Sequence, residues 1–504
     1  MNATETLQAF RNLIRKIQYY NEAVGVLYWD MRTGAPRKGL EDRSEVLGLL
    51  SGEVFRMSVS DEMGQYLEEL SRPDVMESLG EVDRRLVEVT KKEFEKSRKI
   101  PPDEYEAYVV LTSKAESVWE TAKQNDDFAS FQPYLEKIVE TIRHFADLWG
   151  YEGHPYNTLL DDYEPGMTVE VLDRVFGELR GRTVPLVNAI REASDKPDAG
   201  LLKRPISPDR QRKFSEFILR EMGYDFGAGR LDRSEHPFAT GLNHGDVRIT
   251  TNYIENDFTF ALFSCMHEGG HALYEQNISP ELKGTTLLTG TSMGIHESQS
   301  RFWENMIGRS RPFWERYYPD LQKAFPGEFG GVPLDDFYRA INVVEPSLIR
   351  IEADEVTYNL HIMVRYELEK ELIGGTLKVA DLPEAWNEKY RSYLGIVPPN
   401  NRQGVLQDMH WSGGAFGYFP SYALGNMYAA QFRNTLMKEL PDFESLIAKG
   451  NFAPIREWLT EKIYRFGRLR TPKQLVESVT GEPLNPVYLT DYFERKFKPI
   501  YHLD

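Results

Sequence analysis

The hydrophobic and polar positions of this chain repeat mostly with the period of an α-helix. Apolar residues recur every three or four positions with charged residues between them, which predicts amphipathic helices. The predicted helices span Asn2–Tyr28, Glu81–Lys99, Asp103–Asn125, Phe131–Trp149, Thr168–Ser194, Ser207–Met222 and Leu334–Leu372. We find no internal repeat and no low-complexity tract. The pattern therefore predicts a mostly α fold.

Prolines mark two breaks in this helical pattern. Pro101 and Pro102 stop one helix, and Asp103 is predicted to be the N-cap of the next, because its carboxylate can accept from the free N–H groups of the first turn. The segment Asp195–Pro208 holds three prolines and Gly200. It is either a linker or a surface loop, and we favour the loop because helical periodicity resumes directly after it.

One segment has the period of a β-strand instead. In Val247–Tyr253, apolar or β-branched residues alternate with polar ones, which predicts a strand with one buried face. It is followed by an apolar run, Phe258–Gln276, that predicts one buried helix. We expect a small β-sheet beside that helix.

The composition narrows the class of protein. The 504 residues include 60 Lys and Arg against 78 Asp and Glu, a net charge of −18 that argues against nucleic acid and anionic membranes as partners. Cys265 is the single cysteine, so a reducing compartment is expected. The start of the sequence lacks the pattern of a secretory signal, and no stretch reaches the roughly 18 apolar residues of a membrane span. We expect a cytoplasmic protein.

The predicted buried helix carries the run His-Glu-Gly-Gly-His, which has the HEXXH pattern of metallopeptidases. His267 and His271 are four residues apart, so both imidazoles lie on one face and can bind one metal ion. Glu268 lies one step round and can act as general base toward water at the metal. The alternative is a structural histidine pair. Against it, Gly269 and Gly270 cost about 1 kcal/mol each inside a helix, which suggests a close approach to the backbone.

The third ligand must come from elsewhere in the chain. Glu275 follows His271 too closely on the same helix, and we expect it to support the site or to lie on the surface. A new helix beginning at Ser292 or Gly294 places Glu297 in its first turns, packed against the first helix. Glu297 is our predicted third ligand, with His296 as the alternative. Two histidines, one glutamate and an open position indicate a catalytic zinc site. Cys265 points away from this face and is predicted to fill the core.

Several separated motifs then give a resemblance. The chain is similar to the M32 family of metallocarboxypeptidases (the Taq/Pfu type) over most of its length. The matching runs are Tyr28–Asp30, Asp161–Met167, Asp232–Phe238, His267–His271, His296–Gln299, Ile349–Asp354 and Gly404–Trp411. One small departure is Ser234, which stands where the family usually has Gly.

The resemblance implies a large, elongated helical body with a deep active-site groove, assembled as a homodimer. It implies release of single residues from the free C-terminus of peptides, with broad specificity and with zinc, or alternatively cobalt, as the metal. We expect one unit over residues 1–504, in which residues 1–195 form one groove wall and residues 206–504 carry the catalytic motifs.

The same resemblance suggests further site residues. Arg350 is the candidate for binding the terminal carboxylate, because its planar fork matches a carboxylate. The alternative is an ordinary ion pair with Asp354, four residues on in a predicted helix. By similarity to the wider group of helical zinc peptidases, which place a His and a Tyr downstream in this way, His410 and Tyr422 are expected to stabilise the oxyanion. Tyr418 is a competitor, and core packing is the alternative for both tyrosines. His236 either contacts substrate or makes a structural hydrogen bond.

The strand Val247–Tyr253 offers a further hypothesis. If its edge is free, an extended peptide can add to the sheet there. Two other functions stay open: an endo-acting oligopeptidase with the same metal helix, and an inactive peptide-binding relative. The intact Glu268 argues against the second, because a binding protein needs no base.

Overall fold

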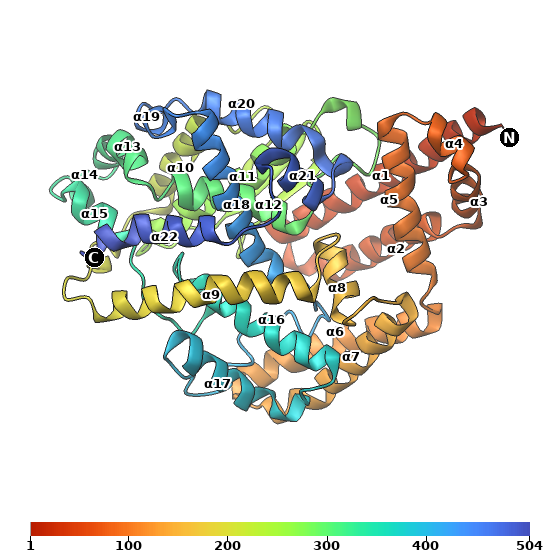
Figure 1. The fold of residues 1–504 in the computed structure, drawn as a ribbon, viewed down its shortest axis with the longest axis horizontal. Coiled ribbons are helices and arrows are strands. Elements are labelled where there is room, and N and C mark those ends of the chain that lie inside the picture. Colours follow the sequence, from red (N-terminus) through yellow and green to blue (C-terminus); the bar gives the residue numbers. More distant parts are fainter. Residues whose placement is uncertain (1, 504) are drawn as a thin grey trace.

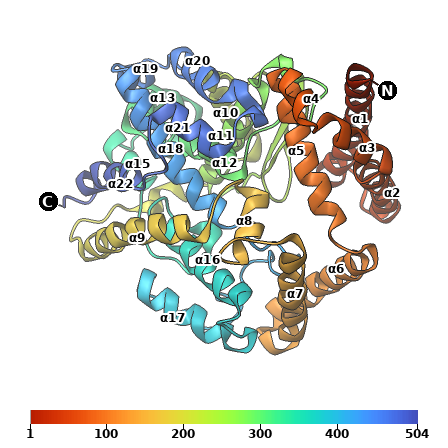
Figure 2. The ribbon, with the colours of Figure 1, turned by 45° about the vertical axis from the view of Figure 1, so that its right-hand side comes forward.

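The computed structural model describes residues 2–503 and shows a mostly helical molecule with one small sheet (Figure 1). The helices of its N-terminal part are α1 (Ala3–Thr33), α2 (Leu40–Ser58), α3 (Asp61–Leu70), α4 (Pro73–Ser78), α5 (Glu81–Arg98), α6 (Pro102–Asn125), α7 (Phe128–Trp149), α8 (Tyr156–Tyr163) and α9 (Val169–Glu192). Red and orange in Figure 1, α1 to α5 form one end of the molecule, and Figure 2 shows α1, α2 and α3 projecting beside the main body.

The main body contains the sheet and the remaining helices. The strands are β1 (Leu231–Arg233), β2 (Ala239–Asn243) and β3 (Asp246–Thr251). The longer helices are α10 (Pro208–Met222), α11 (Phe258–Gln276), α12 (Met293–Arg301), α13 (Arg311–Ala324), α16 (Tyr358–Gly374), α17 (Leu382–Leu394), α18 (Pro420–Glu439) and α22 (Val487–Ile500). The shorter ones are α14 (Pro326–Phe329), α15 (Leu334–Ala340), α19 (Phe443–Ala448), α20 (Ala453–Lys462) and α21 (Pro472–Thr480). No helix within residues 2–503 is long and apolar enough to cross a bilayer.

Most of the predicted helices are confirmed, with shifted ends. The buried helix over Phe258–Gln276 has the bounds of α11. Pro101, not Asp103, is the N-cap of α6, since Pro102 occupies the first helical position, where its missing N–H costs nothing. The segment Asp195–Pro208 contains a short 3-10 turn and buries the side chains of Leu202 and Ile206. It is therefore a packed loop and not a free linker.

The predicted helix Leu334–Leu372 is wrong. The chain forms α15, then an irregular segment with a 3-10 turn at Arg350–Glu352, and then α16. Pro346 accounts for the break, because it cannot donate a helical hydrogen bond and disfavours helical geometry at Glu345. Asp354 instead accepts hydrogen bonds from the N–H groups of Val356 and Thr357. The predicted ion pair between Arg350 and Asp354 does not form.

The sheet has the strand order β1-β3-β2. The predicted strand corresponds to β3, which ends at Thr251, two residues earlier than expected. β3 pairs in parallel with β1 and antiparallel with β2, so it is the central strand. The hypothesis of a free edge on this strand is therefore wrong, and β1 and β2 provide the edges of the sheet.

Small residues allow α10 and α12 to pack closely against α11, and α18 to pack closely against α12. A Cβ on Gly270 would lie 2.6 Å from the carbonyl oxygen of Gln299 in α12, and one on Gly269 would lie 2.7 Å from Leu219 in α10. A Cβ on Gly425 of α18 would overlap the side chain of Glu297. The expected close approach at Gly269 and Gly270 is confirmed, and it brings Glu297 to the histidine helix.

Candidate active site

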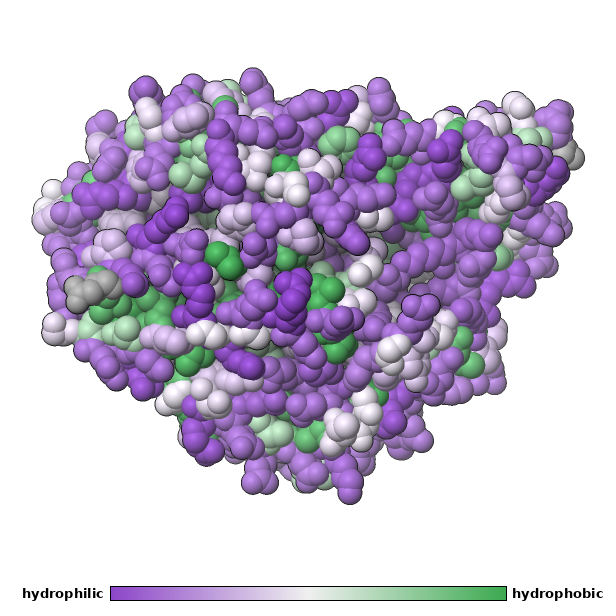
Figure 3. All heavy atoms as spheres, in the orientation of Figure 1, coloured by the Kyte–Doolittle hydropathy of each residue, from purple (hydrophilic) through white to green (hydrophobic). Residues whose placement is uncertain are grey.

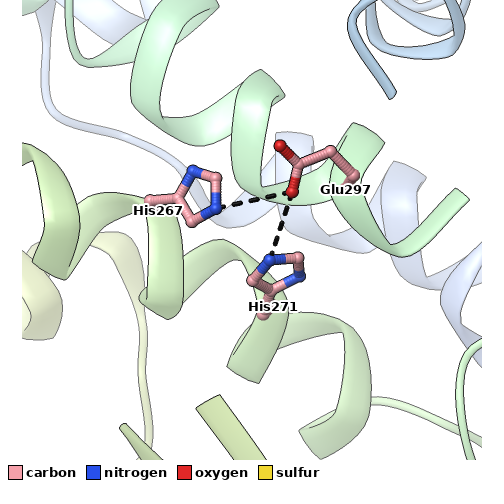
Figure 4. A group of neighbouring side chains, drawn as sticks. All are labelled: His267, His271 and Glu297. Carbon is pink, nitrogen blue, oxygen red and sulfur yellow. Dashed lines mark ion pairs between the residues drawn. The ribbon is translucent and has the colours of Figure 1, made fainter. Parts of the chain in front are cut away.

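Three ligand-type atoms of the predicted metal site face one point (Figure 4). His267 and His271 project from α11, and Glu297 projects toward them from α12. Oε2 of Glu297 lies 3.4 Å from Nε2 of His267 and 3.5 Å from Nε2 of His271. These separations match the distances between neighbouring ligand atoms around one tetrahedral ion.

A chain of hydrogen bonds holds the other ring nitrogen of His271. Its Nδ1 lies 2.6 Å from Nδ1 of His296, whose Nε2 lies 2.9 Å from Oε1 of Glu275. A carboxylate oxygen accepts, so Nε2 of His296 donates to Glu275, and in a neutral His296 the Nδ1 atom then accepts from Nδ1 of His271. This arrangement leaves Nε2 of His271 unprotonated toward Glu297, as a metal ligand must be.

The other two ligand-type residues are fixed by neighbouring charges. Nδ1 of His267 donates to Oε2 of Glu304 over 2.9 Å, and Glu304 belongs to a π-helical turn, Phe302–Ile307, that continues α12. Nε of Arg301 donates to Oε1 of Glu297 over 2.7 Å, which turns Oε2 toward the histidines. Partners of this kind orient metal ligands and raise their basicity.

The electrostatics at this point favour a cation. Burial opposes the protonation of His267, but the carboxylates of Glu297 and Glu304 outweigh it and raise the pKa of His267 to about 10. Burial lowers the pKa of His271 to about 4. Burial raises the pKa of Glu297, but Arg301 and His267 outweigh it and keep that pKa well below its usual value. The three residues therefore fit a divalent ion, both in donor chemistry and in charge.

Glu268 lies beside this cluster on the wall of a cleft. It follows His267 directly on α11, and its side chain is buried. Burial raises the pKa of Glu268 to about 7, a value at which a carboxylate can both take and return a proton near neutral pH. Cys265, as predicted, is buried in the core, and burial raises the pKa of its thiol to about 12.

The cleft has a volume of about 1410 Å³, and its lining includes the three ligand-type residues His267, His271 and Glu297. Its walls come from α1, β2, α11, α12 and the start of α18. The loop before α12, Glu93 and Arg468 complete the lining. Of the predicted substrate-side residues, Tyr418 and Tyr422 line this cleft. Their rings meet edge to face, with centroids 5.0 Å apart. The structure thus brings both tyrosines to the cleft that Glu268 also lines.

Arg350 lies behind this tyrosine wall. Its Nε and Nη2 atoms donate to the two carboxylate oxygens of Asp408 over 3.1 and 2.9 Å, and its guanidinium carbon lies 5.2 Å from the ring centre of Tyr422. Only 7 % of Arg350 is exposed, and the residue is not part of the cleft lining. In this conformation its carboxylate partner is Asp408.

Two other predicted residues also lie outside the cleft lining. The ring of His410 stacks on Tyr418 with centroids 5.8 Å apart, and burial lowers the pKa of His410 to about 3, so the imidazole is neutral. The side chain of His236 is exposed, and its carbonyl oxygen accepts a hydrogen bond from Ser234. The next residues of that segment, Pro237 and Phe238, do line the cleft.

Sequence reasoning missed the residues that support the ligands. Glu304 and Arg301 received no role, although Arg301 and Glu304 follow Glu297 by four and seven residues, a spacing that places all three on one helical face. That spacing was the available signal. Glu275 was expected to support the site or to lie on the surface, and its contact with His296 places it among the supporting residues.

Comparison with known proteins gives consistent matches over nearly the whole chain. The family described as Carboxypeptidase Taq (M32) metallopeptidase matches residues 9–497. Carboxypeptidase 1 of Bacillus subtilis (strain 168) is 49 % identical over 494 residues, which cover 98 % of each chain. Thermostable carboxypeptidase 1 of Thermus thermophilus is 42 % identical and covers 98 % of this chain and 99 % of its own. The crystal structure of the M32 carboxypeptidase from Deinococcus radiodurans R1 has a TM-score of 0.96 at 38 % identity and covers 99 % of this chain and 100 % of its own.

Proposed function

The chain belongs to the M32 family of metal-dependent carboxypeptidases, and we propose that it releases single amino acids from the free C-terminus of peptides with broad side-chain tolerance. The observation that carries this proposal is the position of Glu268, a buried carboxylate with a pKa near 7, beside a three-atom ligand cluster in one cleft. A metal-assisted hydrolase needs this combination of base and ligands.

We propose that His267, His271 and Glu297 hold one divalent ion, with zinc preferred and cobalt as the alternative. Two imidazole nitrogens and one carboxylate oxygen suit zinc, although metal availability also selects the ion. When bound, the ion would polarise the scissile carbonyl and lower the pKa of the attacking water.

The remaining roles fall to residues of the cleft walls. Glu268 takes a proton from the attacking water and returns it to the leaving amine. Tyr422 donates to the oxyanion that develops on the former carbonyl oxygen, and Tyr418 contacts the substrate beside it. His410 stacks on Tyr418 and lies outside the cleft lining, whereas Tyr422 lines the cleft. We therefore assign the oxyanion contact to Tyr422 in preference to His410.

Arg350 remains our candidate for the terminal carboxylate. Its guanidinium lies directly behind Tyr422, so the substrate's C-terminus would lie at that end of the cleft. Binding there requires the substrate to share or replace the pairing with Asp408. His236 remains a secondary candidate through the segment that leads to the cleft-lining residues Pro237 and Phe238.

The edge strand β2 offers a surface for the peptide backbone. Ala239, Gly241, Leu242 and Asn243 of β2 line the cleft, and β2 pairs with β3 on one side only. An extended peptide can therefore add to this edge by main-chain hydrogen bonds. In this proposal α1, from residues 1–195, forms the opposing wall, and residues 206–504 carry the chemistry.

We further propose a cytoplasmic homodimer. A single cysteine suits a reducing compartment. Helix α2 has no buried side chain, and its Phe55 stacks on Tyr105 of α6 with ring centroids 6.1 Å apart, so the two helices expose apolar residues side by side. The face seen in Figure 3 is mostly hydrophilic, with hydrophobic residues gathered toward its middle and left. The exposed apolar residues of the two helices are Val46, Leu49, Phe55, Tyr105, Val109 and Val110.

One experiment tests the proposed activity against its alternatives. Mass analysis of the products from a free peptide and from its C-terminally amidated form, with and without chelator, should show stepwise loss of single residues from the free form only. Equal cleavage of both forms would indicate an endo-acting oligopeptidase. Binding without cleavage of either form would indicate an inactive peptide-binding relative.

A further inference from the structure

Besides the metal-ligand residues and the two tyrosines, the lining of the cleft contains three cationic residues. Arg15 of α1, Lys283 in the loop before α12, and Arg468 all line it. They gather around one loop segment. The backbone N–H of Arg468 donates to the carbonyl oxygen of Leu287 over 3.0 Å, and a Cβ on Gly284 would lie 3.4 Å from Nε of Arg15. Arg15, Lys283 and Arg468 therefore lie along one loop segment, residues 283–287, and are called the cluster below.

Among the described residues 2–503, two of these cations have no counter-charge. Arg468 pairs with Glu93 over 2.7 Å. The side chains of Arg15 and Lys283 make neither an ion pair nor a hydrogen bond within residues 2–503, although the chain has a net charge of −18. Nearby Glu22 already accepts from the amide of Asn243 over 2.7 Å. The charges of Arg15 and Lys283 are thus available to something that enters the cleft.

A third observation points to the same place. His244, in the turn between β2 and β3, also lines the cleft, and its Nδ1 atom is buried with no hydrogen-bond partner in the described part of the chain. A buried polar atom without a partner is unusual in a native structure and often marks the site of a missing ligand or water. Burial and, after it, the charge of Lys283 lower the pKa of His244 below its usual value.

The direction of a bound peptide connects this cluster to the metal site. If the terminal carboxylate lies at the Tyr422 end, the upstream residues run past the metal cluster and along β2 toward His244 and Lys283. An extended chain advances about 3.3 Å per residue. A Cβ on Gly241 of β2 would lie 3.1 Å from Oε2 of Glu275, which supports the metal site through His296, and His244 is three residues further along the chain. The cluster therefore lies several residues upstream of the scissile bond.

We propose that Arg15 and Lys283, together with His244, form an anion-recognition subsite that favours peptides with an Asp or Glu side chain several residues upstream of the scissile bond. This proposal rests on the proposed function, because it takes its direction from the position of the substrate's C-terminus. The cleft would then prefer peptides with an upstream acidic side chain, whichever residue is released from the C-terminus.

The test uses pairs of peptides that share one C-terminal residue and differ by Glu against Gln at a single position, scanned from the third to the sixth upstream residue. The metal-loaded wild type should hydrolyse the Glu member of one pair roughly fivefold more efficiently, mainly through KM, and added salt should remove the difference. The double variant Arg15→Gln/Lys283→Gln should lose this preference while its rate on the Gln peptides stays unchanged.

A matched control removes the same charge elsewhere. Lys38 and Lys449 are exposed, make no ion pair within residues 2–503, and do not line the cleft, so Lys38→Gln/Lys449→Gln should keep the preference. The proposal is overturned if the wild type shows no preference at any position, or if the Arg15/Lys283 variant loses the same factor on both peptides. Binding of fluorescent versions of the peptide pairs gives a second readout. If the wild type hydrolyses neither peptide, the proposed function fails, and the binding comparison still decides the subsite.

Discussion

Nδ1 of His271 lies 2.6 Å from Nδ1 of His296. This contact makes His296 part of the metal site although it does not belong to the ligand cluster. Through Glu275, it fixes which nitrogen of His271 carries the proton, and so which nitrogen is free for the ion.

The first prediction concerns this relay. His296→Ala should weaken metal binding roughly 10- to 100-fold, because His271 loses the partner that holds its tautomer. Glu275→Gln retains an acceptor for His296 and should have a smaller effect. Chelator competition on the purified variants measures the affinity without relying on activity. Unchanged metal affinity in His296→Ala would show that the relay does not control the ligand.

The second prediction concerns the base. Glu268→Gln should retain the metal and lose activity by roughly 10²- to 10⁴-fold, because the amide cannot accept the proton of the attacking water. Metal content and kcat, measured on the same preparation, separate a lost base from a lost ion. A variant with near-normal kcat would show that another group acts as the base.

The third prediction concerns helix packing. Gly270→Ala should destabilise the protein and reduce metal binding, because its Cβ would meet the backbone of Gln299 and displace the helix that carries Glu297. Gly181→Ala in α9 is the control. A Cβ there meets no atom within 4 Å, so the substitution should stabilise the helix by up to about 1 kcal/mol. Thermal unfolding and metal content of both variants test the pair.

The fourth prediction concerns pH. Burial raises the pKa of Glu164 to about 7, and this carboxyl accepts from the N–H of Gly294 and the hydroxyl of Tyr428. Because the folded state holds this proton more tightly than the unfolded state, stability should be highest below pH 4.5 as far as this group is concerned. It should fall as the pH rises to about 7, by roughly 3 kcal/mol.

Comparison of thermal unfolding at pH 5 and pH 8 measures this effect. Glu164→Gln should show a smaller loss of stability between the two pH values than the wild type, because the amide does not titrate. Glu106→Gln, which changes an exposed carboxyl of α6, should behave as the wild type does. An identical pH dependence in Glu164→Gln and the wild type would rule out this assignment.

The fifth prediction concerns Arg350. If it binds the terminal carboxylate, Arg350→Gln should raise KM for free peptides and reduce the discrimination against amidated ones. Asp408→Asn keeps the guanidinium and should retain the discrimination. Loss of stability by about 3–5 kcal/mol in both variants, with discrimination intact, would instead indicate a purely structural ion pair.

The sequence by itself determined the features that depend on local spacing. The histidines four residues apart share a helical face in any helix, and the apolar run around them predicted a buried helix with the bounds of α11. The capping chemistry of Ser292 was also local, and this residue does begin the helix that carries Glu297. The family motifs extended the prediction from a metal site to carboxypeptidase activity.

Only the tertiary structure decided the features that depend on contacts between distant segments. Strand order is one, because periodicity shows which face of a strand is buried but not which neighbours pair with it, so β3 was wrongly given a free edge. The partner of Arg350 is another. Local spacing in a continuous helix pointed to Asp354, four residues away, but the chain around Pro346 is not helical. Folding brought Asp408, 58 residues away, to the guanidinium. A long side chain takes the best-placed counter-charge in space, and the sequence does not record distance in space.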